Sequence, residues 1–177
     1  MNNNLIITIG REYGTGGREI GQKLALRLGI PFYDRELITR AAKKTGFDEK
    51  LFEQLDKRAT NSFLYSLTMF GSVGLNGMSL TDQLYLAQSN IIREMAEDSS
   101  CVVVGRCADH VLRDFHNKFD FFIHGSIEDR VKRIQTCGDY EIEGKTPEAA
   151  LEKMDKQRST YYNYYTGKVW GKCDHYD

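Results

Sequence analysis

A glycine-rich segment near the amino terminus has the residue types of a phosphate-binding loop. Residues 10–19 read Gly-Arg-Glu-Tyr-Gly-Thr-Gly-Gly-Arg-Glu. Glycines let the backbone approach an anion closely, and backbone N–H groups at the start of a helix bind phosphate oxygens. A tight turn is the alternative explanation for these glycines. Because the segment joins an expected strand to an expected helix, we predict that phosphates bind to Gly14, Thr15, Gly16 and Gly17.

The segment departs from the regular P-loop pattern GxxxxGK[ST], in which a lysine and then a hydroxyl residue follow the last glycine. If Gly16 is that glycine, Gly17 stands in the place of the lysine. We expect the next cation, Arg18, to reach the phosphates instead, and a solvent-facing charge is the alternative. Glu19 falls near the position of the hydroxyl residue that binds magnesium. A dinucleotide-binding GxGxxG loop is not favoured, because Glu19 stands where its last glycine would be.

The elements expected around this loop alternate between strands and helices. Residues 5–9 are apolar and β-branched, which is typical of a buried parallel strand. Residues 18–28 repeat apolar side chains at helical spacing and end before Gly29, and a second strand is expected over residues 30–33. Further elements are strands over 101–104 and 119–124 and capped helices from Thr81, Ser126 and Thr146. The pattern predicts a three-layer α/β fold with a mainly parallel sheet.

The composition fits one globular domain. The chain has 177 residues, of which 41% are hydrophobic and 28% are charged, and its formal net charge is -1. This balance excludes the overall basicity of a nucleic-acid-binding domain, so we expect a local anion site and no nucleic-acid partner. The first apolar run is too short for a signal peptide or a membrane span, so we expect a cytoplasmic protein without a membrane partner. The four cysteines form no CxxC pair, and we predict neither a disulfide nor a metal site held by protein ligands alone.

Three segments together are characteristic of a known family. They are ITIGREYGTGGREIGQKLALRLGIPFYD, SSCVVVGRCADHVL and DKQRSTYYNYYTGKVWG. In this combination the chain resembles the cytidylate kinase-like family, a branch of the nucleoside monophosphate (NMP) kinases, over nearly its whole length. The resemblance implies ATP and Mg²⁺ as cofactors and nucleotides as substrates. In relatives of this kind a further strand and helix follow the tyrosine-rich segment, and without that strand we expect a sheet edge that is left unpaired or is covered by a partner chain.

The resemblance also implies a division of the chain into parts. Residues 1–177 form a single kinase-like domain of the P-loop kinase type, with a core over 1–33 and 100–130. An NMP-binding insertion covers residues 34–99, and a helical lid and carboxyl-terminal region cover 131–177. The apolar, glycine-containing stretch 61–80 fits a flap or an oligomer contact, so a homo-oligomer is one expectation.

Site residues are implied by the same resemblance. Asp34 and Arg40 match the acid and the arginine that begin the NMP-binding region, and Arg93 matches an arginine of similar use. Arg106 matches the arginine of the GRD signature, whose aspartate is Cys107 here, with Asp109 as a possible substitute. Resemblance to the lid and its charged cluster adds Arg130, Arg133, Asp155 and Arg158. The arginines expected to act in catalysis are Arg18, Arg106, Arg130, Arg133 and Arg158.

Phosphoryl transfer explains why arginines would gather in this way. Transfer between two phosphate anions needs alignment and charge neutralisation more than acid–base chemistry, and arginine forks bind phosphate bidentately. Each arginine alone has a simpler explanation as a surface charge, and Arg130 and Arg133 have possible partners in Glu128 and Asp129.

The tyrosine-rich segment allows two structural interpretations, and the whole sequence allows three hypotheses about function. Tyr161, Tyr162, Tyr164 and Tyr165 fit aromatic packing or a dimer contact, or a lid that stacks on a base. The leading hypothesis is ATP-dependent phosphorylation of CMP or dCMP. The alternatives are a nucleotide-binding module with weak or no catalysis, favoured by the missing loop lysine, and a kinase of another small molecule, favoured by Cys107.

Overall fold

A computed structural model describes residues 3–34, 80–138, 140 and 146–177 of the chain. The strands are β1 (Ile6–Arg11), β2 (Phe32–Tyr33), β3 (Cys101–Val104) and β4 (Lys118–Ile123). The helices are α1 (Gly17–Leu28), α5 (Leu80–Asp98), α6 (Ala108–Val111), α7 (Ile127–Thr136), α8 (Pro147–Thr166) and the short 3₁₀ helix η2 (Cys173–His175). Arg40 and nearly all of the expected flap over residues 61–80 lie outside the described residues.

The four strands form one parallel sheet in the order β2-β3-β1-β4. In the central pair Ile6 lies opposite Cys101 and Ile9 lies opposite Val104. The carboxyl ends of β1 and β3 therefore meet at the same edge of the sheet. Apolar, β-branched sequences favour such central strands because both faces are covered. The predicted parallel sheet is confirmed, and the predicted second strand is shorter than expected, covering only Phe32–Tyr33.

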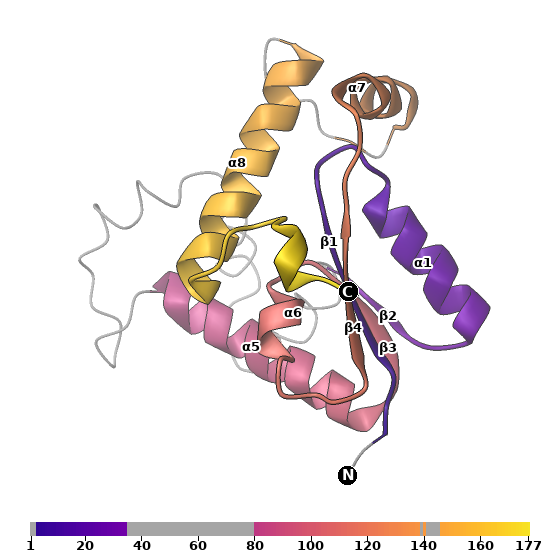
Figure 1. The fold of residues 1–177 in the computed structure, drawn as a ribbon, viewed down its shortest axis with the longest axis vertical. Coiled ribbons are helices and arrows are strands. Elements are labelled where there is room, and N and C mark those ends of the chain that lie inside the picture. Colours follow the sequence, from indigo (N-terminus) through magenta and orange to yellow (C-terminus); the bar gives the residue numbers. More distant parts are fainter. Residues whose placement is uncertain (1–2, 35–79, 139, 141–145) are drawn as a thin grey trace.

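Alternating side chains of the central strands form two hydrophobic cores, one on each face of the sheet. The core on the α1 side contains Ile7, Ile9, Ala25, Val102 and Val104. The core on the opposite side contains Ile6, Ile92, Ala96, Cys101, Val103, Ala108, Val111 and Leu112. Figure 1 shows α1 on one side of the strands and α5 and α6 on the other. The three-layer α/β architecture is confirmed.

Local capping signals define the end of α1 and the starts of α7 and α8 as the sequence predicts, whereas the cap predicted at Thr81 is wrong, because α5 begins one residue earlier, at Leu80. Helix α1 ends at Gly29, whose φ of 65° is in the left-handed region that glycine adopts readily. Ser126 caps α7 by accepting a hydrogen bond from the backbone N–H of Asp129, and Thr146 caps α8 in the same way. Helix α8 begins at Pro147. These caps fix where α7 and α8 begin beside the sheet.

The last residue of the chain, Asp177, is hydrogen-bonded to the edge strand β4. At the outer edge of β4, the backbone N–H of Asp120 donates to the Asp177 carboxylate, and the backbone N–H of Asp177 donates to the carbonyl of Asp120.

Within the described ranges, none of the helices combines the length and the apolar character needed to cross a membrane.

Candidate active site

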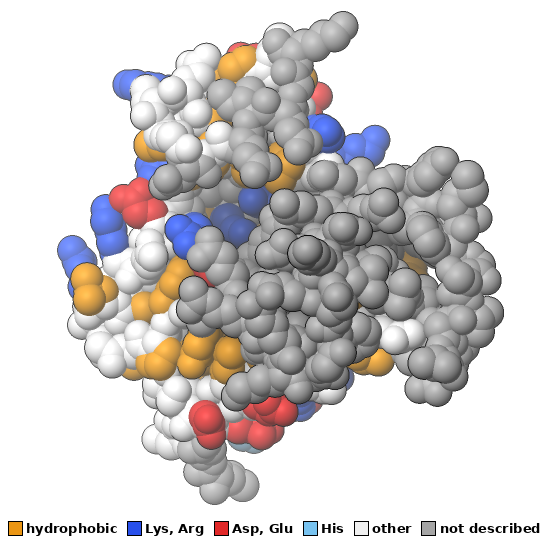
Figure 2. Space-filling view, turned by 180° about the vertical axis from the view of Figure 1, so that it is seen from behind, with side chains coloured by type: hydrophobic (Ala, Val, Ile, Leu, Met, Phe, Trp, Pro, Cys, Tyr) orange, Lys and Arg blue, Asp and Glu red, His pale blue; other side chains and the backbone are white. Residues whose placement is uncertain are grey.

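A cavity of about 620 Å³ opens at the carboxyl ends of β1 and β3. Its walls come from the loops after these strands, the first turn of α1 and the inner faces of α7 and α8. Figure 2 shows Lys and Arg side chains gathered in a hollow near the middle of one face. The cavity brings together most of the residues singled out from the sequence: Gly14, Gly16, Gly17, Arg18, Glu19, Asp34, Arg106, Asp109, Arg133 and Arg158.

The glycine loop has backbone geometry that requires glycine. Gly14 and Gly16 have φ values of 81° and 76°, a region that other residues rarely adopt. A Cβ atom at Gly16 would lie 2.7 Å from Cζ of Arg133. The backbone N–H groups of the first helical turn have no partner within the helix, so the start of α1 offers donors to an anion in the cavity.

Thr15 belongs to the loop but has a different environment. Its hydroxyl donates to the carbonyl of Glu12 at 2.9 Å. Thr15 lines a second, smaller cavity of about 470 Å³ together with Arg130 and Gly125. In this structure Thr15 thus stabilises the loop from the side away from the main cavity.

The turn after β3 is strained. Gly105, Arg106 and Cys107 have φ values of 78°, 59° and 55° in succession. Left-handed backbone at a non-glycine residue costs about 1–3 kcal/mol, and here two such residues are adjacent. The turn brings Arg106 to the cavity wall, while Cys107 is buried at the start of α6. Strain of this kind is concentrated at functional sites.

Arg11, Arg106 and Arg158 form a group of like charges in the cavity. Nη1 of Arg158 donates to the carbonyl of Arg11 at 3.1 Å, and the Arg158 guanidinium lies 5.1 Å from the centre of the Tyr13 ring. Burial, followed by the charges of Arg158 and Arg106, lowers the pKa of Arg11. Burial is also the main cause that lowers the pKa of Arg158. A bound anion would relieve this electrostatic repulsion.

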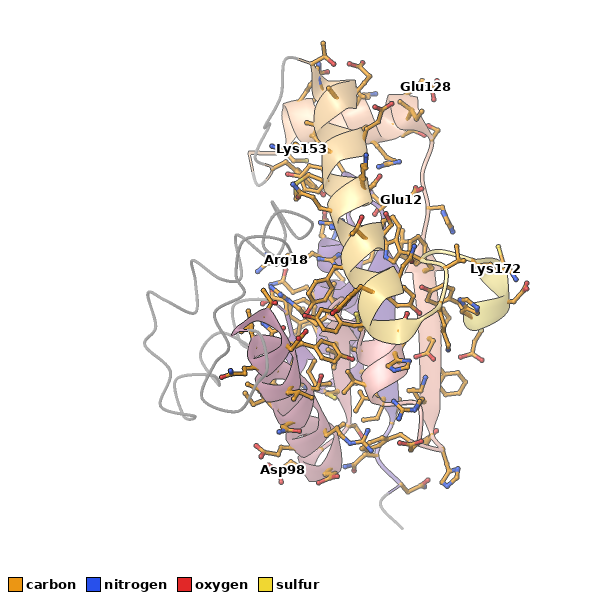
Figure 3. All side chains as sticks on the ribbon, turned by 90° about the vertical axis from the view of Figure 1, so that its left-hand side faces the viewer. Glu12, Arg18, Asp98, Glu128, Lys153 and Lys172 are labelled. Atoms are coloured by element: carbon orange, nitrogen blue, oxygen red, sulfur yellow. The ribbon has the colours of Figure 1, made fainter. Side chains whose placement is uncertain are left out.

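Two other arginines of the cavity contact carboxylates at its wall. Nε of Arg18 lies 2.7 Å from Oδ2 of the buried Asp34. Arg133 is ion-paired with Glu19, and its Nε donates to the Tyr140 hydroxyl at 3.3 Å. The hydrogen bond with Tyr140 is the main cause that raises the pKa of Arg133. Figure 3 shows Arg18 at mid-height of the molecule, well above Asp98, the last residue of α5.

Arg130 and Arg93 lie outside the lining of the main cavity. Arg130 is buried, donates from Nε to the carbonyl of Tyr13 at 2.7 Å, and is ion-paired with Asp155 and Glu12. It lines the smaller cavity and not the main one. The expected partners Glu128 and Asp129 are not the ones it contacts.

Arg93 joins two helices. It donates to the carbonyl of Val111 and to the Asp114 carboxylate, the latter at 3.2 Å, and it lies 5.9 Å from the centre of the Phe115 ring. Arg93 is not among the residues that line the main cavity. The structure therefore gives it a role in holding α5 against the segment after α6.

The tyrosine run belongs to helix α8 and combines packing with cavity lining. The rings of Tyr85 and Tyr165 are stacked with centroids 3.9 Å apart, and Tyr161 meets both at steeper angles. The Tyr162 hydroxyl donates to Asp109 at 2.5 Å. Burial raises the pKa of Asp109, and the Tyr162 hydrogen bond opposes this shift. Aromatic packing between α5 and α8 thus fixes one wall of the cavity.

Arg11 is a charged cavity residue that was not predicted from the sequence. Two features of the sequence pointed to it: an arginine at the end of the first strand, and a glycine where a P-loop has its lysine. The direction of the Arg11 side chain, and hence its place in the cavity, depends on the three-dimensional fold.

The carboxylates of the cavity fit a magnesium ion that is held mainly by phosphates. In the described residues, no cluster of three or more His, Cys, Asp or Glu side chains could hold a metal ion. Mg²⁺ in kinases is bound by one or two carboxylates together with substrate phosphates and water. Glu12, Glu19 and Asp34 line the same cavity as the glycine loop, and each of them also forms an ion pair with an arginine.

Comparisons with known proteins agree with this architecture. A solved structure of an uncharacterized protein from Eubacterium ventriosum ATCC 27560 has 32% sequence identity and a TM-score of 0.69, covering 98% of this chain and 86% of that chain. Shikimate kinase from Bacteroides thetaiotaomicron has 15% identity and a TM-score of 0.54, covering 90% of this chain and 82% of its own. A gluconokinase from Sinorhizobium meliloti 1021 has 15% identity and a TM-score of 0.51, with coverage of 89% and 76%.

The last two structures confirm the P-loop kinase type of fold, and at this identity they show the fold alone. No curated protein matches the chain. The model of the cytidylate kinase-like family matches residues 6–177. This match includes the glycine loop, the strained turn after β3 and the tyrosine run of α8, and the chain therefore belongs to the cytidylate kinase-like family.

Proposed function

We propose that this protein transfers the γ-phosphoryl group of ATP to a nucleoside monophosphate, with CMP or dCMP as the acceptor. Membership of a kinase-like family supports phosphoryl transfer in general. The observation that carries the proposal is that the glycine loop and the guanidinium groups of Arg11, Arg106 and Arg158 line one cavity. Polyphosphate chains carry the multiple negative charges that this arrangement attracts.

The proposed reaction is a direct displacement at phosphorus. An oxygen of the acceptor phosphate attacks the γ-phosphorus of ATP, the bond from that phosphorus to the β–γ bridging oxygen breaks, and ADP leaves with the electron pair. Because the acceptor is already an anion, no base has to remove a proton. The protein has to align the two nucleotides and offset their charge. We assign the amides at the start of α1 to the phosphates of ATP and Arg106 and Arg158 to the transferred group.

We assign acceptor binding to Asp34, which forms an ion pair with Arg18, and to Asp109, which lies on the cavity wall formed after β3. A carboxylate accepts a hydrogen bond from the exocyclic amino group of cytosine, and Asp109 offers such an acceptor beside Tyr162. This chemistry, together with the family, supports CMP or dCMP over a pyrimidine without that amino group.

Mg²⁺ bound with ATP would offset phosphate charge, and Asp34, Glu12 and Glu19 are the carboxylates that would contact it or its water.

We place the reaction in the cytoplasm, which fits the four cysteines, none of which forms a disulfide. The role of Arg40, the division into core, NMP-binding region and lid, and a homo-oligomer stay predictions.

The test is a coupled ADP-release assay with CMP, dCMP, UMP, AMP and GMP, run beside calorimetric binding of ATP and of each monophosphate. We expect turnover with CMP or dCMP and a clear preference over UMP. The variant Asp109→Asn should reduce that preference, while Asp98→Asn, a change of the same kind at the far end of the sheet, should leave it unchanged.

Two outcomes would contradict the proposal. Tight nucleotide binding without turnover would identify a binding module, which the glycine at position 17 favours. Activity only on a hydroxylated compound that is not a nucleotide would identify a kinase of another small molecule, the class to which the structurally similar shikimate kinase and gluconokinase belong.

A further inference from the structure

The side chain of Arg11 occupies space that two glycines leave open. A Cβ atom at Gly17 would lie 2.7 Å from the Cβ of Arg11, and a Cβ atom at Gly105 would overlap the Arg11 guanidinium. These glycines come from the start of α1 and from the turn after β3. A side chain at either position would displace Arg11, so the path of Arg11 across the cavity depends on both.

Arg11 lies where a bound phosphate needs a cation. It is the last residue of β1, and it lines the main cavity together with Gly14, Gly16 and Gly17. In a regular P-loop the lysine that contacts the β- and γ-phosphates follows the last glycine of the loop. Here that position is Gly17, and Arg11 fills the space beside it.

Among the described residues, none provides a carboxylate within ion-pair distance of the Arg11 guanidinium. The charged groups that act on it most strongly are Arg158 and Arg106, which lower its pKa in addition to burial, while Asp34 acts in the opposite direction. A bound anion would offset the repulsion among these three cations. Arg18 differs, because it contacts Asp34 and half of its side chain is exposed.

We propose that Arg11 binds the β- and γ-phosphates of ATP in place of the P-loop lysine, and that position 17 is glycine because a side chain there would exclude Arg11. This inference rests on the proposed function. The guanidinium reaches the phosphates from the end of the strand, whereas the lysine of a regular loop reaches them from the first turn of the helix. Its planar fork can bind two phosphate oxygens at once.

A charge swap between positions 11 and 17 tests the assignment. Arg11→Ala should weaken ATP binding about 10- to 100-fold and lower kcat about 100-fold or more. Gly17→Lys alone should cause a similar loss, because its side chain collides with Arg11. The double variant Arg11→Gly/Gly17→Lys, which also removes the Arg11 Cβ that a side chain at position 17 would meet at 2.7 Å, should recover most of the ATP affinity that Arg11→Ala and Arg11→Gly lose, since the new lysine then enters the space that Arg11 leaves. A merely structural role for Arg11 predicts no such recovery.

Three further variants complete the experiment. Arg11→Gln keeps most of the side-chain packing and removes the charge, so it repeats the test independently of any loss of folding in Arg11→Ala. Arg27→Ala, an exposed arginine at the end of α1, is the matched control and should bind ATP like the unmodified protein. Arg18→Ala tests the rival assignment from the sequence.

The result that overturns the inference is a double variant that binds ATP no better than Arg11→Ala, or a loss of ATP affinity in Arg18→Ala and not in Arg11→Gln. ATP affinity is measured by calorimetry without an acceptor, so the inference and the proposed function can fail separately. If the protein binds ATP through Arg11 but phosphorylates no monophosphate, the proposed function fails and the inference stands. If it phosphorylates CMP and Arg11→Gln does so equally well, only the inference fails.

Discussion

Arg130 and Arg11 have opposite electrostatic surroundings. Arg130, in the first turns of α7, is surrounded by groups that accept its hydrogen bonds and offset its charge: the carboxylates of Asp155 and Glu12 and the carbonyl of Tyr13. Only 7% of its side chain is exposed. This arginine binds the end of β1 to α8 and needs nothing from outside the protein.

Arg11, in the main cavity, has no such counter-ion among the described residues, whereas Arg18 and Arg133 of the same cavity are ion-paired with Asp34 and Glu19. Arg11 experiences the positive charges of Arg158 and Arg106 more strongly than any negative charge of the described residues. The strained turn that brings Arg106 to the cavity adds to the free-energy cost of the arrangement. The difference separates an arginine that holds the fold together from one whose charge no described carboxylate offsets at ion-pair distance.

Removal of Arg130 should have the largest effect on stability. Arg130→Ala leaves the carboxylates of Asp155 and Glu12 partly buried without their cation, which we expect to lower the free energy of unfolding by about 3–5 kcal/mol. Urea unfolding measures this value. Arg113→Ala, which removes an exposed arginine beside Asp114, should cost less than about 1 kcal/mol. Equal losses in both variants would show that the ion pairs of Arg130 do not hold α7 and α8 to the loop.

Removal of Arg106 should act on catalysis. Arg106→Ala should lower kcat/KM for CMP by about 100- to 1000-fold, the size expected when one preorganised group that stabilises developing negative charge is lost. The ADP-release assay gives this ratio, and urea unfolding of the same sample separates a catalytic loss from a loss of folding. Arg113→Ala serves again as the control and should retain activity. Full activity in Arg106→Ala would remove this arginine from the site.

The sequence predicts the strands, the helix caps and the glycine loop better than it predicts the contacts of the arginine side chains. The β-branched run over 101–104, the caps at Ser126 and Thr146, and the glycine loop are local signals, and each is found where it is expected. The partner of an arginine is not a local property. Arg130 meets Asp155 across two helices, and the course of Arg11 depends on glycines of two other segments, so neither could be derived from spacing along the chain.

Arg93, like Arg130, donates hydrogen bonds to groups of the protein itself, although the family resemblance implies a substrate contact for it. Arg93→Ala should lower the free energy of unfolding by about 1–2 kcal/mol, because charged hydrogen bonds to the carbonyl of Val111 and to Asp114 are lost at a partly exposed site. Calorimetric CMP affinity should stay unchanged. A marked loss of CMP affinity with normal stability would return Arg93 to the substrate site.

The smallest effect concerns Asp109, the carboxylate on the cavity wall that does not serve as a counter-ion for the arginines. Burial is the main cause that raises its pKa, and no arginine is among the groups that lower it. An acid whose pKa is raised by folding stabilises the native state fully below its unfolded pKa, about 3.9, and this contribution is lost as pH rises through the folded pKa. Asp109→Asn should therefore flatten the decline in unfolding free energy over that pH range.

The sign of this pH dependence decides between two electrostatic descriptions of the cavity. If Asp109 were the counter-ion of Arg106 or Arg158, its pKa would be lowered, and stability would be lost on acidification instead. Urea unfolding at several pH values, with Asp98→Asn as the exposed control, distinguishes the two directions. A decline toward acid that disappears in Asp109→Asn would mean that the protein supplies its own anion to these arginines, and the contrast with Arg130 would then not hold.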